Sequence, residues 1–170
     1  SSLTLPAHTA WLDDVAIDAG AELPIAGDRL DMPMQMLFTS GTTGDPKAIV
    51  GSYLRYASIG EMLRLFGVAP GDRMYTGLSL THANALAITL GGALYTGIPA
   101  VISRRFTKSR LWSVIRDFDC TTMNLLGGMF SAIYSEPRTA RDADNPLRLV
   151  LGAGMPKNLW EPFAQRFGVQ

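Results

Sequence analysis

The stretch "FTSGTTGDPK", Phe38 to Lys47, places hydroxyl side chains, two glycines, a turn and one lysine in a single short loop. It begins at the end of the apolar run "MQMLF", which we interpret as a buried strand. Backbone amides in a tight glycine turn bind anions, and glycine lets an oxyanion approach closely. Lys47 adds a mobile positive charge that suits phosphate. The stretch therefore predicts a loop that binds a polyphosphate at the end of a strand.

This loop differs from the two common phosphate-binding motifs. Gly44 is followed by Asp45 and Pro46, whereas the P-loop of nucleoside triphosphatases requires Lys and Ser or Thr there. The dinucleotide fingerprint Gly-x-Gly-x-x-Gly is also absent from the sequence. A surface turn without a ligand is the alternative, but the string "TSGTTGDPK" is too specific for that to be favoured.

The remaining pattern predicts an α/β protein: a mainly parallel sheet with helices on both faces. Residues 1–33 are irregular and are interpreted as a connecting arm, and 34–170 form the folded part. Beyond 34–38 we expect strands at 73–79, 100–103, 120–126 and 147–152, and helices at 52–66, 82–95, 107–118, 128–134 and 156–168. Ligands gather at the carboxyl ends of such strands, so the glycine-bearing turns that follow them should line one edge.

Several side chains carry more detailed predictions. Trp112, Phe118 and Trp160 stand at helical spacing with other apolar residues and are expected in the core. Pro162 should weaken or kink the last helix. Cys120 opens an apolar strand and should be buried and inert.

Composition narrows the functional class. The 170 residues are 47% hydrophobic, and 15 basic residues balance 15 acidic ones, so no basic patch indicates nucleic acid or an anionic membrane as partner. One cysteine, histidines without metal-ligand spacing and the absence of a signal-peptide pattern favour a reducing, cytoplasmic setting. Residues 74–103 carry no formal charge, but Gly, Pro and polar residues interrupt them, so a transmembrane helix is not expected.

The string "TSGTTGDPK" resembles the signature loop of the adenylate-forming (AMP-binding) enzymes, in their acyl-CoA synthetase branch. The segments "LSLTHANALAITLGGALYTG", "RRFTKSRLWSVIRDFDCTTMNLLGGM" and "LRLVLGAGMPKNLWEPFAQRFGV" resemble the regions that follow, most closely in small-acid or carnitine-type CoA ligases. The resemblance implies an enzyme of fatty acid metabolism that uses ATP and Mg²⁺ to activate a carboxylic acid as acyl-AMP and transfers the acyl group to coenzyme A.

The resemblance also implies roles for individual residues. Lys47 and His82 would act in catalysis, Thr39 would help to hold magnesium, and His82 would contact the acid. The nucleotide would bind the phosphate loop and the adenine-side loop, which comprise Thr39, Ser40, Gly41, Thr42, Thr43, Gly44, Lys47, Gly152, Ala153, Gly154, Met155 and Pro156. The acyl pocket would include Gly127, Gly128 and Met129. From the residues alone, a histidine that caps the following helix is the favoured interpretation of His82, and the resemblance shifts it to the site.

The sequence departs from the family pattern at Ala48, Tyr53 and Thr81, where glycine, histidine and phenylalanine are usual. It also stops before the segment expected to supply a magnesium-binding glutamate, the ribose-binding aspartate and a catalytic lysine. We therefore expect residues 34–170 to be part of the adenylation domain, truncated at both ends and inactive alone, with exposed edges that favour homo-oligomers. A non-enzymatic nucleotide-binding module, delivery to a carrier-protein thiol and, last, a membrane-associated domain remain alternatives.

Overall fold

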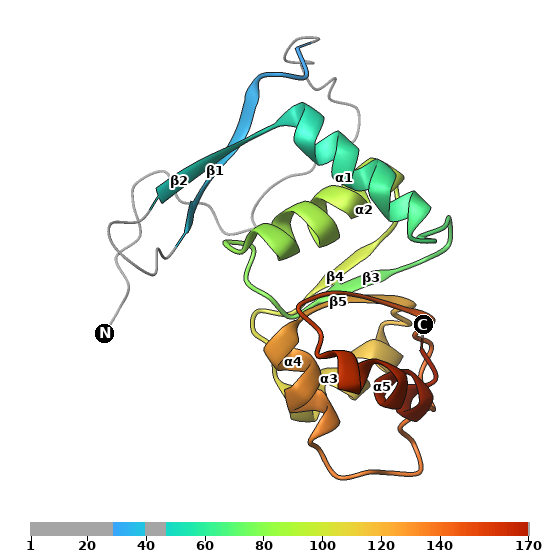
Figure 1. The fold of residues 1–170 in the computed structure, drawn as a ribbon. Helices are drawn as coiled ribbons and strands as arrows, with labels where there is room; N and C mark the ends of the chain where they lie inside the picture. The colour runs from blue at the N-terminus through green and yellow to red at the C-terminus, as the bar shows by residue number, and fades with distance from the viewer. Residues whose placement is uncertain (1–28, 40–46, 170) are drawn as a thin grey trace, which may run out of the picture.

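The computed structural model describes residues 29–39 and 47–169, with Thr39 described by its backbone only. The chain forms a three-layered α/β body from which a β-hairpin projects (Figure 1). The hairpin consists of β1 (Pro33–Thr39) and β2 (Lys47–Ser52), which pair antiparallel. All other strands belong to the body.

A four-stranded parallel sheet forms the middle layer, in the order β4-β3-β5-β6. Its strands are β3 (Met74–Thr76), β4 (Ala100–Ile102), β5 (Thr122–Leu126) and β6 (Leu149–Ala153). Parallel neighbours require crossover connections, and helices supply them here. The predicted fold class, a parallel sheet between helices, is confirmed.

The helices divide between the two faces of the sheet (Figure 1). One face is covered by α1 (Tyr53–Leu65), the π-helix η2 (Asn84–Gly91) and α2 (Gly92–Thr96). The other is covered by α3 (Lys108–Asp117), α4 (Gly127–Tyr134) and α5 (Trp160–Phe167), which follows the 3₁₀ turn η3 (Lys157–Leu159). The predicted helix over 82–95 is thus present, although its first half has π geometry.

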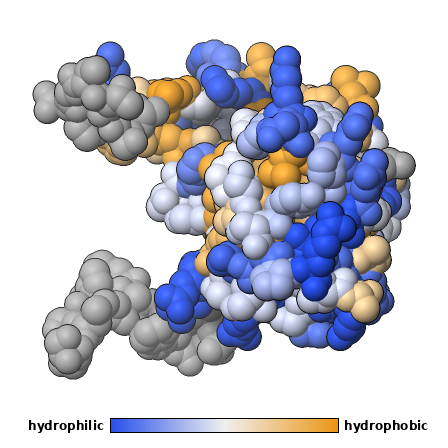
Figure 2. All heavy atoms as spheres, turned by 60° about the horizontal axis from the view of Figure 1, so that its bottom comes forward, coloured by the Kyte–Doolittle hydropathy of each residue, from blue (hydrophilic) through white to orange (hydrophobic). Residues whose placement is uncertain are grey.

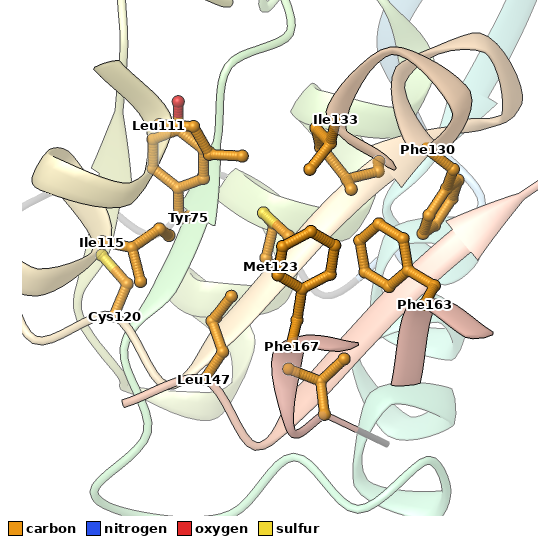
Figure 3. Packing of buried hydrophobic residues seen from close by; sticks show 12 residues of the cluster. Tyr75, Leu111, Ile115, Cys120, Met123, Phe130, Ile133, Leu147, Phe163 and Phe167 are labelled. Carbon is orange, nitrogen blue, oxygen red and sulfur yellow. The ribbon is translucent and has the colours of Figure 1, made fainter. Parts of the chain in front are cut away.

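The larger core lies between the sheet and the α3–α5 layer (Figure 3). Phe130 meets Phe163 edge to face with ring centroids 5.3 Å apart, and Trp112 stacks on Phe167 at 4.6 Å. Such pairs add about 0.5–1.5 kcal/mol to the burial of their area. Cys120 is fully buried in the same cluster, as predicted.

Two ion pairs, one of them half exposed at its arginine, fasten loops to this body. Arg148 pairs with Asp72 and also donates to the Gly67 carbonyl at 2.6 Å, so the chain before β6 is tied to the loop after α1. Arg166 of α5 pairs with Asp142 at 2.6 Å and donates to three backbone carbonyls of the loop that follows α4. Because a buried charge requires such partners, the buried Asp72 carboxylate and the buried Arg166 guanidinium make both pairs structural anchors.

The prediction that the first strand is buried in the sheet was wrong. β1 exists, but it pairs with β2 outside the parallel sheet, and Met36 and Phe38 are 57% and 69% exposed. Apolar side chains stand on both faces of this strand between Met34 and Phe38, with Gln35 as the polar exception. Figure 2 shows a largely hydrophilic surface over the body and apolar colour on the arm that projects at the upper left.

Three side-chain predictions were also wrong. Trp160 and Phe118 are 64% and 52% exposed, because they stand at the start of α5 and just after α3, where the helix no longer faces the sheet. Pro162 does not interrupt α5, because it is the third residue of the helix, where the backbone N–H has no intrahelical partner.

Within the described ranges, no helix is long and apolar enough to cross a membrane. The uncharged segment 74–103 is divided into β3, a turn, η2 with α2, and β4.

Candidate active-site cleft

A cleft of about 660 Å³ lies between the hairpin and the α1–η2 face of the body. Four parts of the chain form its wall: both hairpin strands, α1, the turn 81–84 with η2, and the ends of β5 and β6 at Leu126 and Ala153. The carboxyl ends of parallel strands therefore meet the hairpin here, as expected for a ligand site in an α/β sheet.

The hairpin contributes one of its two faces to the cleft. Gln35, Leu37, Ile49 and Gly51 line it from that face, and Phe38 also reaches the cleft near the end of β1. A Cβ at Gly51 would lie 3.1 Å from the ring of Tyr56 on α1, so any larger residue would require that ring to shift. Burial raises the pKa of the Tyr56 phenol, so this ring acts as a neutral wall residue.

The predicted phosphate loop connects β1 to β2 in the sequence. Thr39 pairs with Lys47 at the last rung of the ladder, and the predicted site residues Ser40, Gly41, Thr42, Thr43 and Gly44 lie outside the described residues. Lys47 is exposed at the start of β2. The two ends of the predicted loop therefore stand side by side, held by a β-ladder.

His82 lies in the turn before η2 and lines the cleft. Its Nδ1 accepts a hydrogen bond from the Asn84 backbone N–H at 3.2 Å. The neutral ring then carries its proton on Nε2, which is left as a donor. His82 thus contacts the start of the following helix and also lines the cleft. The hydrogen bond to Nδ1 fixes the tautomer of the neutral ring, which leaves Nε2–H as the donor.

The two glycine loops at the ends of β5 and β6 are in direct contact. A Cβ at Gly127 would lie 3.0 Å from the carbonyl carbon of Gly154 and closer still to its oxygen, whereas a Cβ at Gly128 would meet nothing within 4 Å. Gly154 has φ +74°, which favours glycine. The close approach of these backbones places Leu126 and Ala153 together at the cleft.

The other predicted site residues do not all face this cleft. Met129 packs against the core on the opposite side of the sheet. Gly152 and Met155 line a small apolar pocket of about 60 Å³ beside Phe163 and Trp160. Pro156 precedes η3 and is half-buried. The structure therefore brings together the hairpin, His82 and Ala153, and separates Met129 from them.

Sequence reasoning missed two polar residues at the cleft and a third, Asn124, that lies buried behind Asn84. Arg55 lines it from the first turn of α1, a position where the helix dipole disfavours a cation. Gln35 lines it from β1, and its Nε2 is buried without a hydrogen-bond partner among the described residues. Asn124, fully buried on β5, donates to the backbone and side-chain oxygens of Asn84. A polar residue inside the apolar run "TTMNLL" was the available signal for Asn124.

Metal ligands are scarce in the part of the chain that the structure describes: it holds no group of three His, Cys, Asp or Glu side chains placed to bind a metal. The predicted contact of Thr39 with magnesium concerns a side chain outside the description.

Known relatives agree with this architecture. Residues 5–170 match the family model "AMP-binding enzyme". The chain is 32% identical over 158 residues to human long-chain fatty acid transport protein 5, and this match covers 90% of the chain and 23% of that protein. It is 32% identical over 160 residues to the medium/long-chain-fatty-acid–CoA ligase FadD17 of Mycobacterium tuberculosis, a match that covers 93% of this chain and 32% of that protein. The chain thus spans less than a third of the length of these relatives.

Among solved structures, O-succinylbenzoate coenzyme A synthetase from Bacillus subtilis, in complex with ATP and magnesium ion, superimposes with a TM-score of 0.67. It is 24% identical, and the match covers 83% of this chain and 29% of that one. The fold is therefore that of part of an acyl-CoA synthetase. Since the family model spans nearly the whole sequence, the chain belongs to the AMP-binding enzyme family.

Proposed function

We propose that this chain is part of an ATP-dependent acyl-CoA ligase. The protein would join a carboxylic acid to AMP with release of pyrophosphate, and then transfer the acyl group to the thiol of coenzyme A. The observation that carries the proposal is the cleft, because the hairpin that bears the predicted phosphate loop forms one wall and His82 stands on the other.

The proposed nucleotide site divides between two ends of the cleft. The loop from Thr39 to Lys47 would hold the polyphosphate, and Gly152–Pro156 would hold adenine. Ala153 supports the second assignment because it reaches the cleft. Magnesium, when bound with ATP, neutralises charge on the leaving pyrophosphate. In this chain Thr39 would contribute one hydroxyl ligand.

The carboxylic acid would lie along the apolar wall of the cleft. Leu37, Ile49 and Ile59 supply apolar surface, and the Nε2–H of His82 is available to a carboxylate oxygen. A carboxylate is already a nucleophile, so the site needs donors that orient it and stabilise charge on the leaving group more than it needs a base. A cleft with few titrating groups is consistent with that requirement.

The experiment is acid-dependent exchange of labelled pyrophosphate into ATP, measured on the complete protein with short, medium and long acids. Lys47→Ala should reduce exchange by removing a charge-assisted contact worth about 1.5–3 kcal/mol, which is about tenfold to a hundredfold. Lys108→Ala is the matched control, because Lys108 makes only a surface pair with Glu136. Equal exchange in the two variants would contradict the role of Lys47, and no exchange with any acid would contradict the activity.

The 170-residue chain alone is expected to give no exchange, since loss of even one preorganised donor typically costs about a hundredfold to a thousandfold. We place the enzyme in the cytoplasm, and homo-oligomer formation remains a prediction. The single cysteine, buried at position 120, supports a reducing compartment.

A further inference from the structure

A second pocket, of about 370 Å³, opens where β4 ends and α3 begins. Its wall contains three arginines, Arg104, Arg105 and Arg110, and we call it the arginine pocket. Its remaining lining residues are Tyr75, Ser103, Thr107 and Val114, so no carboxylate faces it. α3 covers the opposite face of the sheet from the α1–η2 face that borders the cleft, so the two sites are separate (Figure 1).

The three guanidinium groups have no ion-pair partner among the described residues. Three other cations in the body are paired: the adjacent Lys108 binds Glu136 at 2.5 Å, Arg148 pairs with Asp72, and Arg166 pairs with Asp142. Three like charges at one pocket repel one another, and an anion in the pocket would relieve that repulsion.

The pocket is a built part of the fold. Gly77, after β3, backs onto the loop that bears the arginines, because a Cβ there would lie 3.1 Å from the Cα of Phe106. The floor holds the buried hydroxyl of Tyr75, which is hydrogen-bonded to Ser103 (Figure 3 shows Tyr75 beside Leu111). Thr107 precedes the first turn of α3, and its hydroxyl makes no capping bond to the helix.

We propose that the arginine pocket binds a phosphoryl anion. Guanidinium groups match phosphate oxygens in geometry and charge. Two hydroxyl groups, of Ser103 and Thr107, add neutral contacts to the remaining oxygens. This site goes beyond the proposed ligase reaction, whose phosphate loop is at Thr39–Lys47.

The test is titration of the complete protein with inorganic phosphate and with pyrophosphate at constant chloride, followed by calorimetry and by the side-chain Nε–Hε signals of arginine in NMR. The variant is Arg104→Gln/Arg110→Gln. Arg138→Gln is the matched control, an exposed arginine outside the pocket. Lys47→Ala separates binding at the phosphate loop from binding at the arginine pocket.

We expect the double variant to weaken the phosphate binding that the arginine signals report about tenfold or more, while Arg138→Gln leaves it unchanged and Lys47→Ala affects only binding at the phosphate loop. The weakening should diminish as chloride rises, since these charges are exposed to solvent. Binding lost in Lys47→Ala alone would assign the anion to the phosphate loop and overturn the proposal. Equal affinity in the double variant and the Arg138→Gln control would overturn it as well. The absence of any binding at millimolar phosphate would also overturn it. Arg105→Gln, on an exposed loop, provides an independent variant if the double variant fails to fold.

Discussion

Replacing Gly127 by alanine should destabilise the protein, whereas the same replacement at Gly128 should not. Both glycines belong to the first turn of α4, and neither has a positive φ. Each alanine would reduce the conformational freedom of the unfolded chain by a similar amount, about 0.4–1 kcal/mol in favour of the folded state. This shared contribution cancels when the two variants are compared.

The difference between the variants comes from the space around each Cβ. At Gly127 the new atom would lie 3.0 Å from the Gly154 carbonyl carbon and closer to its oxygen, whereas at Gly128 it would meet nothing within 4 Å. Carbon atoms normally stand about 3.5–4.0 Å apart, so the backbone at Gly154 must retreat by half an ångström or more, at a cost of about 1–3 kcal/mol. Gly127→Ala should therefore be less stable than Gly128→Ala by that amount.

Urea unfolding followed by far-ultraviolet circular dichroism measures the difference. With a slope near 2 kcal/mol per molar urea, the midpoints of the two variants should differ by about 0.5–1.5 M. In the complete enzyme, Gly127→Ala should also weaken AMP binding more than Gly128→Ala, because it separates two loops of the proposed site. Identical midpoints would show that the approach of Gly127 to Gly154 is not maintained in solution, and would refute the reasoning.

Two further predictions concern titrating groups. Burial opposes ionisation of Asp72, but hydrogen bonds from Arg148, the Ala69 amide and Thr121 outweigh it and lower the pKa of the carboxyl. The stability that the ionised carboxylate contributes to folding should therefore be present above about pH 4 and lost as the pH falls further. Asp72→Asn should cost about 1–3 kcal/mol at neutral pH in urea unfolding and flatten the acid side of the stability profile; an unchanged profile would contradict this. Burial raises the pKa of the Cys120 thiol to about 11, so the stability that the buried neutral thiol contributes to folding should be lost as the pH rises from about 8.5 to 11. A thiol reagent at pH 8 should modify Cys120 only at the rate of unfolding. Rapid modification of the native protein would contradict its burial.

The parallel sheet and its helices could be predicted because their signals are local. Ser52 caps α1 through its side chain, and Gly168, with φ +67°, ends α5 where the sequence placed the end of the last helix. The strands of the sheet are short apolar runs bounded by turns, which is how buried parallel strands usually appear.

The hairpin could not be predicted from such signals. β2 was not expected as a strand, because its stability depends on pairing with β1 across a loop rather than on its own composition. In the same way, the π geometry of η2 leaves no periodic pattern that distinguishes it from an α-helix over eight residues. At the site, Arg55 and Gln35 were missed because only the folded chain brings α1 and β1 to one cleft.

The hairpin also explains why an apolar run and a phosphate loop adjoin in this sequence. One face of β1 and β2, with Leu37 and Ile49, borders the cleft proposed for the acid, and the loop proposed for the nucleotide connects the two strands. Leu37 is apolar where it borders the cleft, whereas Met36 on the other face is 57% exposed. The hairpin is joined to the body directly through Ser52, the N-cap of α1. Any tilt of this hairpin would therefore move the phosphate loop and the wall of the acid site together, so occupancy of one would bias the other.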